Sequence, residues 1–131
     1  MEDKQLLEHA RQAREKAYVP YSRFPVGAAL LLEGGEVVTG CNIENAAFPL
    51  CNCAERTAIF KAVSEGKTKI EKIAVVADTP GPVSPCGACR QVMAEFFKPD
   101  TPVILGNLKD DVMVMPVKEI LPYSFSKEDM E

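Results

Sequence analysis

The strongest constraint on the fold of this chain is a pair of cysteine-containing stretches that lie far apart in the sequence. The first reads Cys-Ala-Glu-Arg from Cys53, and the second reads Pro-Cys-Gly-Ala-Cys-Arg-Gln from Pro85. A catalytic zinc site typically takes three side chains as ligands and leaves a fourth position open for water. Cys53, Cys86 and Cys89 supply three thiolates, so a fold in which they bind one zinc ion must bring the two stretches together.

Both stretches are predicted to lie at the start of a helix. Cys86 and Cys89 are separated by about one helical turn, so both sulfurs can point the same way. The residues from Ala54 to Val63 also have a helical pattern. Two helix N-termini would then face one metal ion, and their partial positive charge favours the thiolate form that binds metal.

Glu55 is the candidate catalytic acid/base. It follows the first ligand closely enough to reach the open position, but it is poorly placed to be a fourth ligand beside Cys53. Bound zinc lowers the pKa of its water from about 15.7 to roughly 7, and a nearby carboxylate can take that proton and return it to the substrate. Taken alone, a Cys-x-x-Cys pair could also be a redox pair, a structural half-site or two buried thiols.

The combination of Cys-Ala-Glu at Cys53 with Pro-Cys-x-x-Cys at Pro85 resembles the zinc-dependent cytidine deaminases, whose signature contains the same Pro-Cys-x-x-Cys. The cysteine at position 53, where many relatives have histidine, indicates the small three-cysteine branch of the cytidine and deoxycytidylate deaminase family. The resemblance runs from Tyr18 to Phe125. It implies a cytoplasmic hydrolase of pyrimidine salvage that converts cytidine and 2′-deoxycytidine to uridine, or 2′-deoxyuridine, and ammonia. It also implies one zinc ion per chain and a homotetramer with shared active sites.

The resemblance assigns substrate-binding roles to several residues. Asn42 and Glu44, in Gly-Cys-Asn-Ile-Glu-Asn-Ala-Ala, match the family's ribose-binding pair, whereas the residues alone are equally compatible with a capping turn. Phe24, in Phe-Pro-Val-Gly-Ala-Ala, matches an aromatic residue that stacks on the base, and its alternative role is in the core. Backbone groups near Ala54, with carbonyls around Ser84, are implied to contact the base edge.

Three further positions complete the comparison with the family. Arg56 matches an arginine that hydrogen-bonds the ligand sulfurs, and such a cation would offset the net negative charge of three thiolates on zinc. Phe125 matches the C-terminal phenylalanine that enters a neighbouring subunit's site. Phe48 is a departure, because cytidine deaminases often carry tyrosine there.

The hydrophobic pattern predicts an α/β fold. The run around residues 73–77 is typical of a strand that is covered on both faces, and a helical crossover to the next strand makes that pair parallel. The expected architecture is a three-layer α/β/α, cytidine deaminase-like fold, with a five-stranded mixed sheet in a single domain spanning residues 1–131. Helices are predicted at residues 3–17, 53–65, 86–97 and 117–121, and strands at 26–32, 37–42, 70–78, 102–106 and 111–115.

Composition restricts the partners. The formal net charge of −4 argues against a nucleic-acid partner, which favours a basic face. The sequence has no apolar run near 18 residues and no signal-peptide pattern at its start, so we expect a cytoplasmic protein with no membrane partner. Cys41 and Cys51 are expected to be reduced, buried thiols, and His9 to be solvated.

Three alternative functions remain at this point. A blasticidin-S-type deaminase shares the cysteine motifs but lacks the combination of Phe-Pro-Val-Gly-Ala-Ala with Gly-Cys-Asn-Ile-Glu-Asn-Ala that this chain carries. A non-catalytic, zinc-stabilised binding module would need a fourth Cys or His ligand, and none lies at a suitable spacing. A polynucleotide deaminase is disfavoured by the acidic charge.

Overall fold

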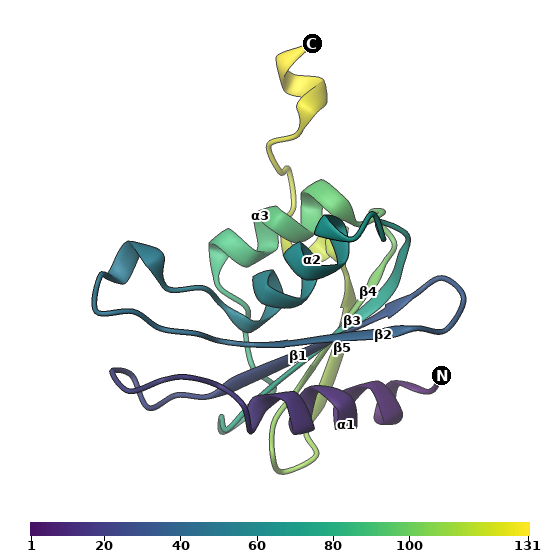
Figure 1. Ribbon diagram of the computed structural model, residues 1–131. Coiled ribbons are helices and arrows are strands. Elements are labelled where there is room, and N and C mark those ends of the chain that lie inside the picture. The colour runs from purple at the N-terminus through teal and green to yellow at the C-terminus, as the bar shows by residue number, and fades with distance from the viewer.

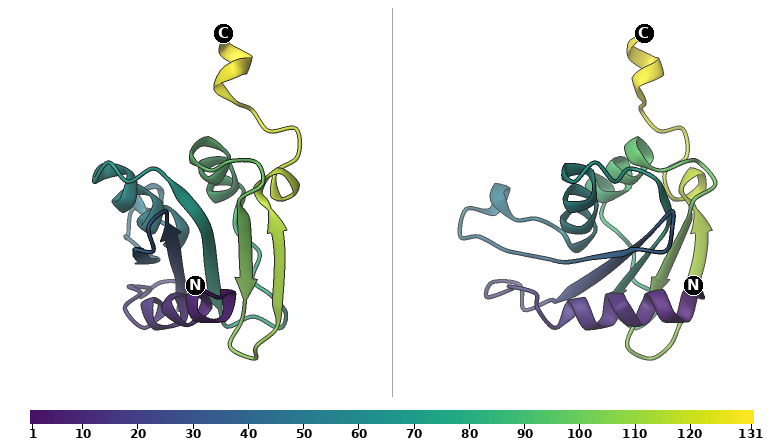
Figure 2. Two further views of the ribbon diagram at one scale, coloured as in Figure 1. Left: turned by 90° about the vertical axis from the view of Figure 1, so that its right-hand side faces the viewer. Right: turned by 45° about the vertical axis from the view of Figure 1, so that its right-hand side comes forward.

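The computed structural model describes residues 1–131 and is built around a five-stranded mixed β-sheet with helices on both faces (Figures 1 and 2). This confirms the predicted three-layer architecture. None of the helices combines the length and apolar character that a membrane-spanning helix requires. The elements in chain order are α1 (Asp3–Arg14), β1 (Val26–Leu32), β2 (Val37–Cys41), η1 (Phe48–Leu50), α2 (Ala54–Ser64), β3 (Ile70–Ala77), α3 (Gly87–Phe96), β4 (Pro102–Gly106), β5 (Val112–Pro116), α4 (Val117–Ile120) and η2 (Lys127–Met130).

The sheet has the strand order β2-β1-β3-β4-β5. β3 and β4 are parallel, with Ile73 opposite Val103, and α3 forms the connection between them. The other neighbouring pairs are antiparallel. The crossover and the antiparallel last strand were both expected from the lengths of the connections, because a parallel pair needs a long crossover and a short connector does not provide one.

Two hydrophobic clusters hold the layers together. The larger one joins α2 and α3 to one face of the sheet, and it includes the fully buried Ile59, Ile73 and Met93. The smaller one joins α1 to the other face through Leu6 and Ala10. β3 contributes to both clusters, which explains why its sequence is an almost continuous apolar run.

The first helix is shorter than predicted. It ends at Arg14 rather than at residue 17, because the chain turns there and Tyr18 pairs with the segment that follows β2. The amide of Tyr18 donates to the carbonyl of Asn42 (3.0 Å), and its carbonyl accepts from the amide of Glu44 (2.9 Å). His9 is exposed on α1, as expected.

α2 lies unusually close to the β1–β2 hairpin, because β2 has a glycine where the helix crosses it. A Cβ at Gly40 would lie 2.5 Å from the amide nitrogen of Ala58 and 2.8 Å from the carbonyl oxygen of Ala54. Only a residue without a side chain fits such a close approach of helix and strand backbones. The position of α2, which carries the candidate acid/base in its first turn, is therefore set by backbone contact with β2.

We expect the substitution Gly40→Ala to lower the free energy of unfolding by about 1 to 3 kcal/mol, the usual cost of overpacking, because α2 must move away from β2. Thermal or urea unfolding would measure this change. Gly81→Ala is a matched control, since a Cβ there meets nothing within 4 Å. Equal stability of the two variants would contradict the tight contact.

Candidate active site

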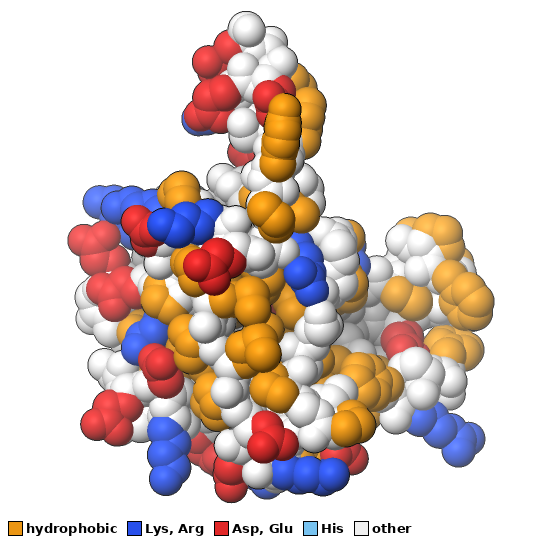
Figure 3. All heavy atoms as spheres, turned by 180° about the vertical axis from the view of Figure 1, so that it is seen from behind, with side chains coloured by type: hydrophobic (Ala, Val, Ile, Leu, Met, Phe, Trp, Pro, Cys, Tyr) orange, Lys and Arg blue, Asp and Glu red, His pale blue; other side chains and the backbone are white.

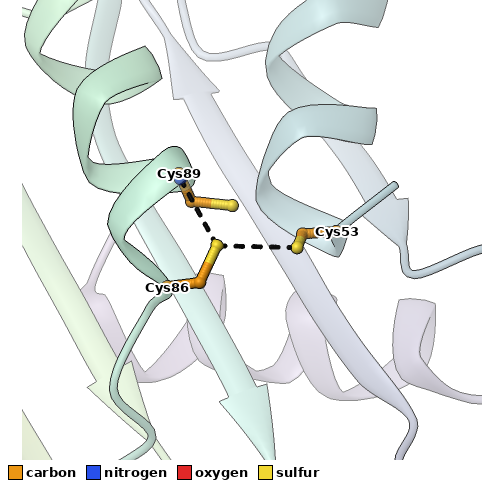
Figure 4. Close-up of side chains that lie close together, drawn as sticks. All are labelled: Cys53, Cys86 and Cys89. Carbon is orange, nitrogen blue, oxygen red and sulfur yellow. Dashed lines mark hydrogen bonds between the residues drawn. The ribbon is translucent and has the colours of Figure 1, made fainter. Parts of the chain in front are cut away.

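The three candidate ligands converge at the N-termini of two helices (Figure 4). Cys53 is the N-cap residue of α2, and Cys86 is the N-cap residue of α3. Cys89 lies in the first turn of α3, where its amide donates to the sulfur of Cys86 (3.4 Å). The sequence-based expectation that two helix starts would meet is therefore confirmed.

The spacing of the sulfurs suits zinc. The Sγ atoms of Cys53 and Cys86 are 3.7 Å apart, and all three sulfurs lie within 4.8 Å of one another. Sulfurs on a tetrahedral zinc ion with Zn–S bonds of about 2.3 Å are separated by about 3.8 Å. The group has three members, so a fourth coordination position is left for water or substrate, as in catalytic zinc sites.

The thiols influence one another's protonation. A hydrogen bond with Cys89, together with hydrogen bonds from Arg56 and Cys86, lowers the pKa of Cys53 to about 5, although burial opposes the shift. The pKa of Cys89 is raised, first by that hydrogen bond with Cys53 and then by burial and the negative charge of Glu55. Without metal, Cys89 therefore retains its proton, and zinc must displace that proton when it binds.

Arg56 provides the positive charge beside the cluster. Its Nη2 donates to the Sγ of Cys53 at 3.1 Å, and the hydrogen bond with Cys53 raises the pKa of the guanidinium further above its usual range. The Nε of Arg56 is buried and has no hydrogen-bond partner. A cation in this position stabilises the thiolate form of the ligands.

Glu55 lies in the interior beside the cluster, in the first turn of α2. Its side chain is only 4% exposed. Burial, helped by the negative charge of the Cys53 thiolate, raises the pKa of Glu55, while its hydrogen bonds with its own amide and with Cys89 oppose the shift. A carboxyl group with a raised pKa holds a proton more readily than an exposed glutamate does, which suits a general acid/base.

A groove next to the cluster brings several of the predicted residues together. It has a volume of about 320 Å³, and Asn42 and Glu44 line it together with Cys53 and Arg56. The two residues proposed to hold the sugar therefore share one groove with a metal ligand and the arginine. The other lining residues are Phe48, Pro49, Cys51 and Asn52.

Asn42 and Glu44 also hold the loop that precedes β1. Asn42 accepts a hydrogen bond from the amide of Val26 (2.9 Å) and donates one to the carbonyl of Phe24 (2.8 Å). Glu44 accepts from the amides of Tyr21 (3.1 Å) and Ser22 (3.0 Å), and from the Ser22 hydroxyl, which lowers the pKa of the carboxyl group. Within the chain, Asn42 and Glu44 therefore act as the capping alternative predicts. Both also line the groove, where a ligand can contact them.

The two predicted aromatic residues do not line this groove. Phe24 is half exposed, and Phe125 lies on the C-terminal segment, where its carbonyl accepts a hydrogen bond from Gln91 on α3 (2.9 Å). Ala54 is buried as the first residue of α2, and Ser84 is exposed just before Cys86. Phe24 is linked to the groove through its carbonyl, which accepts from Asn42, whereas Phe125 is linked to α3.

Sequence reasoning missed some residues around the groove. Asn52 lines it and donates a hydrogen bond to the hydroxyl of Thr57 (3.2 Å), but a single asparagine before a cysteine gave no signal. Phe48, noted only as a departure from the family, lines the groove and packs edge-on against Tyr21, with ring centroids 6.5 Å apart. Cys51 is a free, half-buried thiol that exchanges hydrogen bonds with Asn45.

The sequence profile of the cytidine and deoxycytidylate deaminase zinc-binding region matches residues 1–105. The chain belongs to the cytidine and deoxycytidylate deaminase family. A cytidine deaminase from Halalkalibacterium halodurans is 61% identical over 130 residues, which cover 99% of this chain and 98% of the relative. One from Sporosarcina psychrophila is 59% identical, with coverages of 99% and 96%. These matches confirm the resemblance drawn from the cysteine motifs.

The structural comparison agrees with the sequence comparison. The crystal structure of a cytidine deaminase from Burkholderia pseudomallei has a TM-score of 0.93 and 53% sequence identity, and the match covers 95% of this chain and 100% of that one. A blasticidin-S deaminase from Bacillus cereus is also related, but at 28% identity over 92% of each chain. The family is zinc-binding, and the cluster of Cys53, Cys86 and Cys89 is suited to hold the ion.

We predict that Arg56→Ala retains zinc but lowers deaminase turnover, because the three thiolates then lack their compensating charge. The loss of a hydrogen bond to a charged group, about 1.5 to 3 kcal/mol, corresponds to roughly 10- to 100-fold in rate. Zinc content by elemental analysis and turnover on the same sample would test this. Arg56→Lys, which keeps the charge, is the matched variant, and wild-type turnover in the alanine variant would contradict the role.

Proposed function

We propose that this protein is a zinc-dependent hydrolase that converts cytidine and 2′-deoxycytidine to uridine, or 2′-deoxyuridine, and ammonia. The observation that carries this proposal is the buried carboxyl group of Glu55 beside a three-thiol cluster with an open fourth position. A structural zinc site is closed by four ligands and has no use for an adjacent acid/base. The similarity to cytidine deaminases over almost the whole chain supports cytidine as the substrate.

The metal would be held by Cys53, Cys86 and Cys89. When bound, zinc supplies a Lewis acid that lowers the pKa of the attacking water to roughly 7. Arg56, hydrogen-bonded to the sulfur of Cys53, offsets the negative charge that three thiolates place around the ion. Such compensation matters because excess negative charge weakens the pull of the metal on that water.

Glu55 carries the protons of the reaction. The oxygen of water forms a bond to C4 of the base, and Glu55 transfers one water proton to N3. The second proton passes through Glu55 to the exocyclic amino group, the C4–N bond breaks, and ammonia leaves as C4 becomes a carbonyl carbon. One water molecule is consumed for each ammonia released. The raised pKa of Glu55 fits a group that must both accept and donate a proton in one cycle.

The nucleoside would be held by residues on three sides. Asn42 and Glu44 contact the sugar hydroxyls, because both line the groove beside Cys53. Phe24 stacks on the base, and the backbone near Ala54, with the carbonyls around Ser84, contacts the base edge. The main-chain hydrogen bonds of Asn42 and Glu44 support these roles, since they fix both side chains before the substrate arrives.

Two apolar projections support a homotetramer. Hydrophobic side chains gather on the loop around η1 and on the C-terminal segment, both of which extend away from the sheet (Figures 1 and 3). Phe48 and Leu50 are exposed on the first, and Tyr123, Phe125 and Met130 on the second. Exposed apolar surface of this kind marks contacts with other chains. We infer that Phe125 enters the site of a neighbouring subunit, so that the tetramer shares its active sites.

Cytidine deamination supplies uridine for reuse, so we place the enzyme in pyrimidine salvage in the cytoplasm, without a nucleic-acid or membrane partner. The acidic net charge of −4 supports the absence of a nucleic-acid partner. The direct test is ammonia release, with the matching ultraviolet change, on cytidine, cytidine 5′-monophosphate and single-stranded DNA. Conversion of cytidine alone is expected. No conversion by zinc-loaded protein would overturn the proposal, and conversion of blasticidin S instead would favour that alternative.

Glu55→Gln should keep the fold and the zinc while turnover falls by roughly 10²- to 10⁴-fold, because the amide cannot carry the proton. Steady-state kinetics together with zinc content would measure both effects. The matched control is Glu65→Gln, since Glu65 is exposed at the other end of the same helix. Unchanged turnover in Glu55→Gln would remove Glu55 as the acid/base, and absence of turnover in both the wild type and the variant would support a zinc-stabilised binding module.

The protein should behave as a tetramer in light scattering, and Phe125→Ala should raise the KM for cytidine. Co-expression of Phe125→Ala chains with Glu55→Gln chains gives the decisive measurement. If sites are shared, an intact Glu55 in one chain meets an intact Phe125 from another, and the mixed tetramers regain a low KM. A monomer in solution, or no recovery in mixed tetramers, would remove Phe125 from the site.

A further inference from the structure

The loop that delivers Cys86 is tied down by a single side chain at its last two residues. Arg90, on α3, donates from Nε to the carbonyl of Pro85 (2.9 Å) and from Nη2 to the hydroxyl of Ser84 (2.7 Å). Its Nη1 donates to the carbonyl of Ile120, the last residue of α4 (2.8 Å). One guanidinium group therefore connects the two residues before the metal ligand Cys86 to a separate helix, α4.

The rest of this loop is held by other contacts. The amide of Val83 donates to the carbonyl of Gly106 (3.3 Å). Asn107, which is buried, donates to the carbonyl of Thr79 (2.9 Å). These bonds fix the start and the middle of the loop against the end of β4. They leave its final part, next to Cys86, to Arg90.

The end of α4 that Arg90 contacts is held in place by the hydrophobic core. Val117 and Ile120 of α4 are buried in the larger hydrophobic cluster, and α4 packs against α3. The guanidinium fork is planar and its donors have fixed directions, so three acceptors on it are fixed relative to one another. A lysine ammonium carries the same charge but cannot reproduce three divergent bonds of this kind.

We propose that Arg90 is a positioning residue for zinc, and this proposal rests on the zinc site of the proposed function. By holding Ser84 and Pro85 against α4, Arg90 fixes the direction of the Cys86 sulfur toward Cys53 and Cys89. Cys86 needs such support because it is the exposed member of the three ligands. Groups that orient metal ligands typically contribute 10- to 100-fold to metal affinity or activity.

The test measures zinc release from the full-length, zinc-loaded protein to an excess of a chromogenic chelator, in the absence of any nucleoside. We expect Arg90→Lys and Arg90→Gln to release zinc roughly 10- to 100-fold faster than the wild type. Lysine should not rescue the effect, because the fork and not the charge is lost. Ser84→Ala, which removes one of the three acceptors, should give a smaller acceleration in the same direction.

A matched control comes from the next residue of α3. Gln91→Ala removes a hydrogen bond to the C-terminal segment without touching the Cys86 loop, so its zinc release should equal that of the wild type. In the Arg90 variants, turnover per bound zinc should fall with little change in KM. A purely structural role would lower the melting temperature of the metal-free protein and leave both zinc release and turnover per bound zinc unchanged.

The proposal would be overturned if Arg90→Lys released zinc at the wild-type rate, whether or not Arg90→Gln released it faster. If the Arg90 variants do not fold, Ser84→Ala decides, and unchanged release in that variant would overturn it as well. Because zinc release is measured without substrate, failure of cytidine deamination in the wild type leaves this measurement intact. A wild-type protein that binds no zinc would overturn both the positioning role and the proposed function.

Discussion

The structure depends on the approach of two helix N-termini above one sheet. α2 and α3 each have a cysteine as N-cap residue, and the larger hydrophobic cluster holds both helices on the same face of the sheet. The partial positive charge at the start of α2 favours the thiolate of Cys53, and the buried Glu55 lies in the first turn of the same helix. A carboxyl group, three sulfurs and a guanidinium therefore share one small volume, in which neighbouring charges and hydrogen bonds shift the pKa values of Cys53, Glu55 and Cys89.

Most of the fold could be predicted from the sequence, because its signals are local. The apolar run of β3 and the prolines and glycines around it mark a strand buried on both faces, and the crossover length makes its partner parallel. The end of α1 could not be predicted, because the helix stops where Tyr18 pairs with a segment after β2, a contact between distant residues. Local propensity carries no information about such a contact.

Only part of the candidate site could be predicted from the sequence. The meeting of Cys53, Cys86 and Cys89 could be predicted from the cysteine motifs and the family resemblance that they carry. The roles of Glu55, Asn42 and Glu44 stay predictions, although the structure places Glu55 beside the cluster and the other two in the groove. The roles assigned to Phe24 and Phe125 stay predictions, since neither residue lines the groove. Arg90 was visible only as part of the cysteine motif, because its acceptors are backbone carbonyls and a hydroxyl that no sequence pattern reports.

The contact at Gly40 fixes the position of β2 relative to α2. Because the backbones of β2 and α2 touch there, the hairpin and the helix form one rigid frame. Asn42 follows β2 on that frame, and Cys53 and Glu55 flank the start of α2. In the proposed function, Asn42 holds the sugar and Glu55 acts at the reacting carbon, so the distance between these two parts of the nucleoside would be set by main-chain contact. A distance set by main-chain contact does not depend on the side chains of the surrounding loops. Those loops could therefore diverge in sequence without altering the length of the ligand that fits.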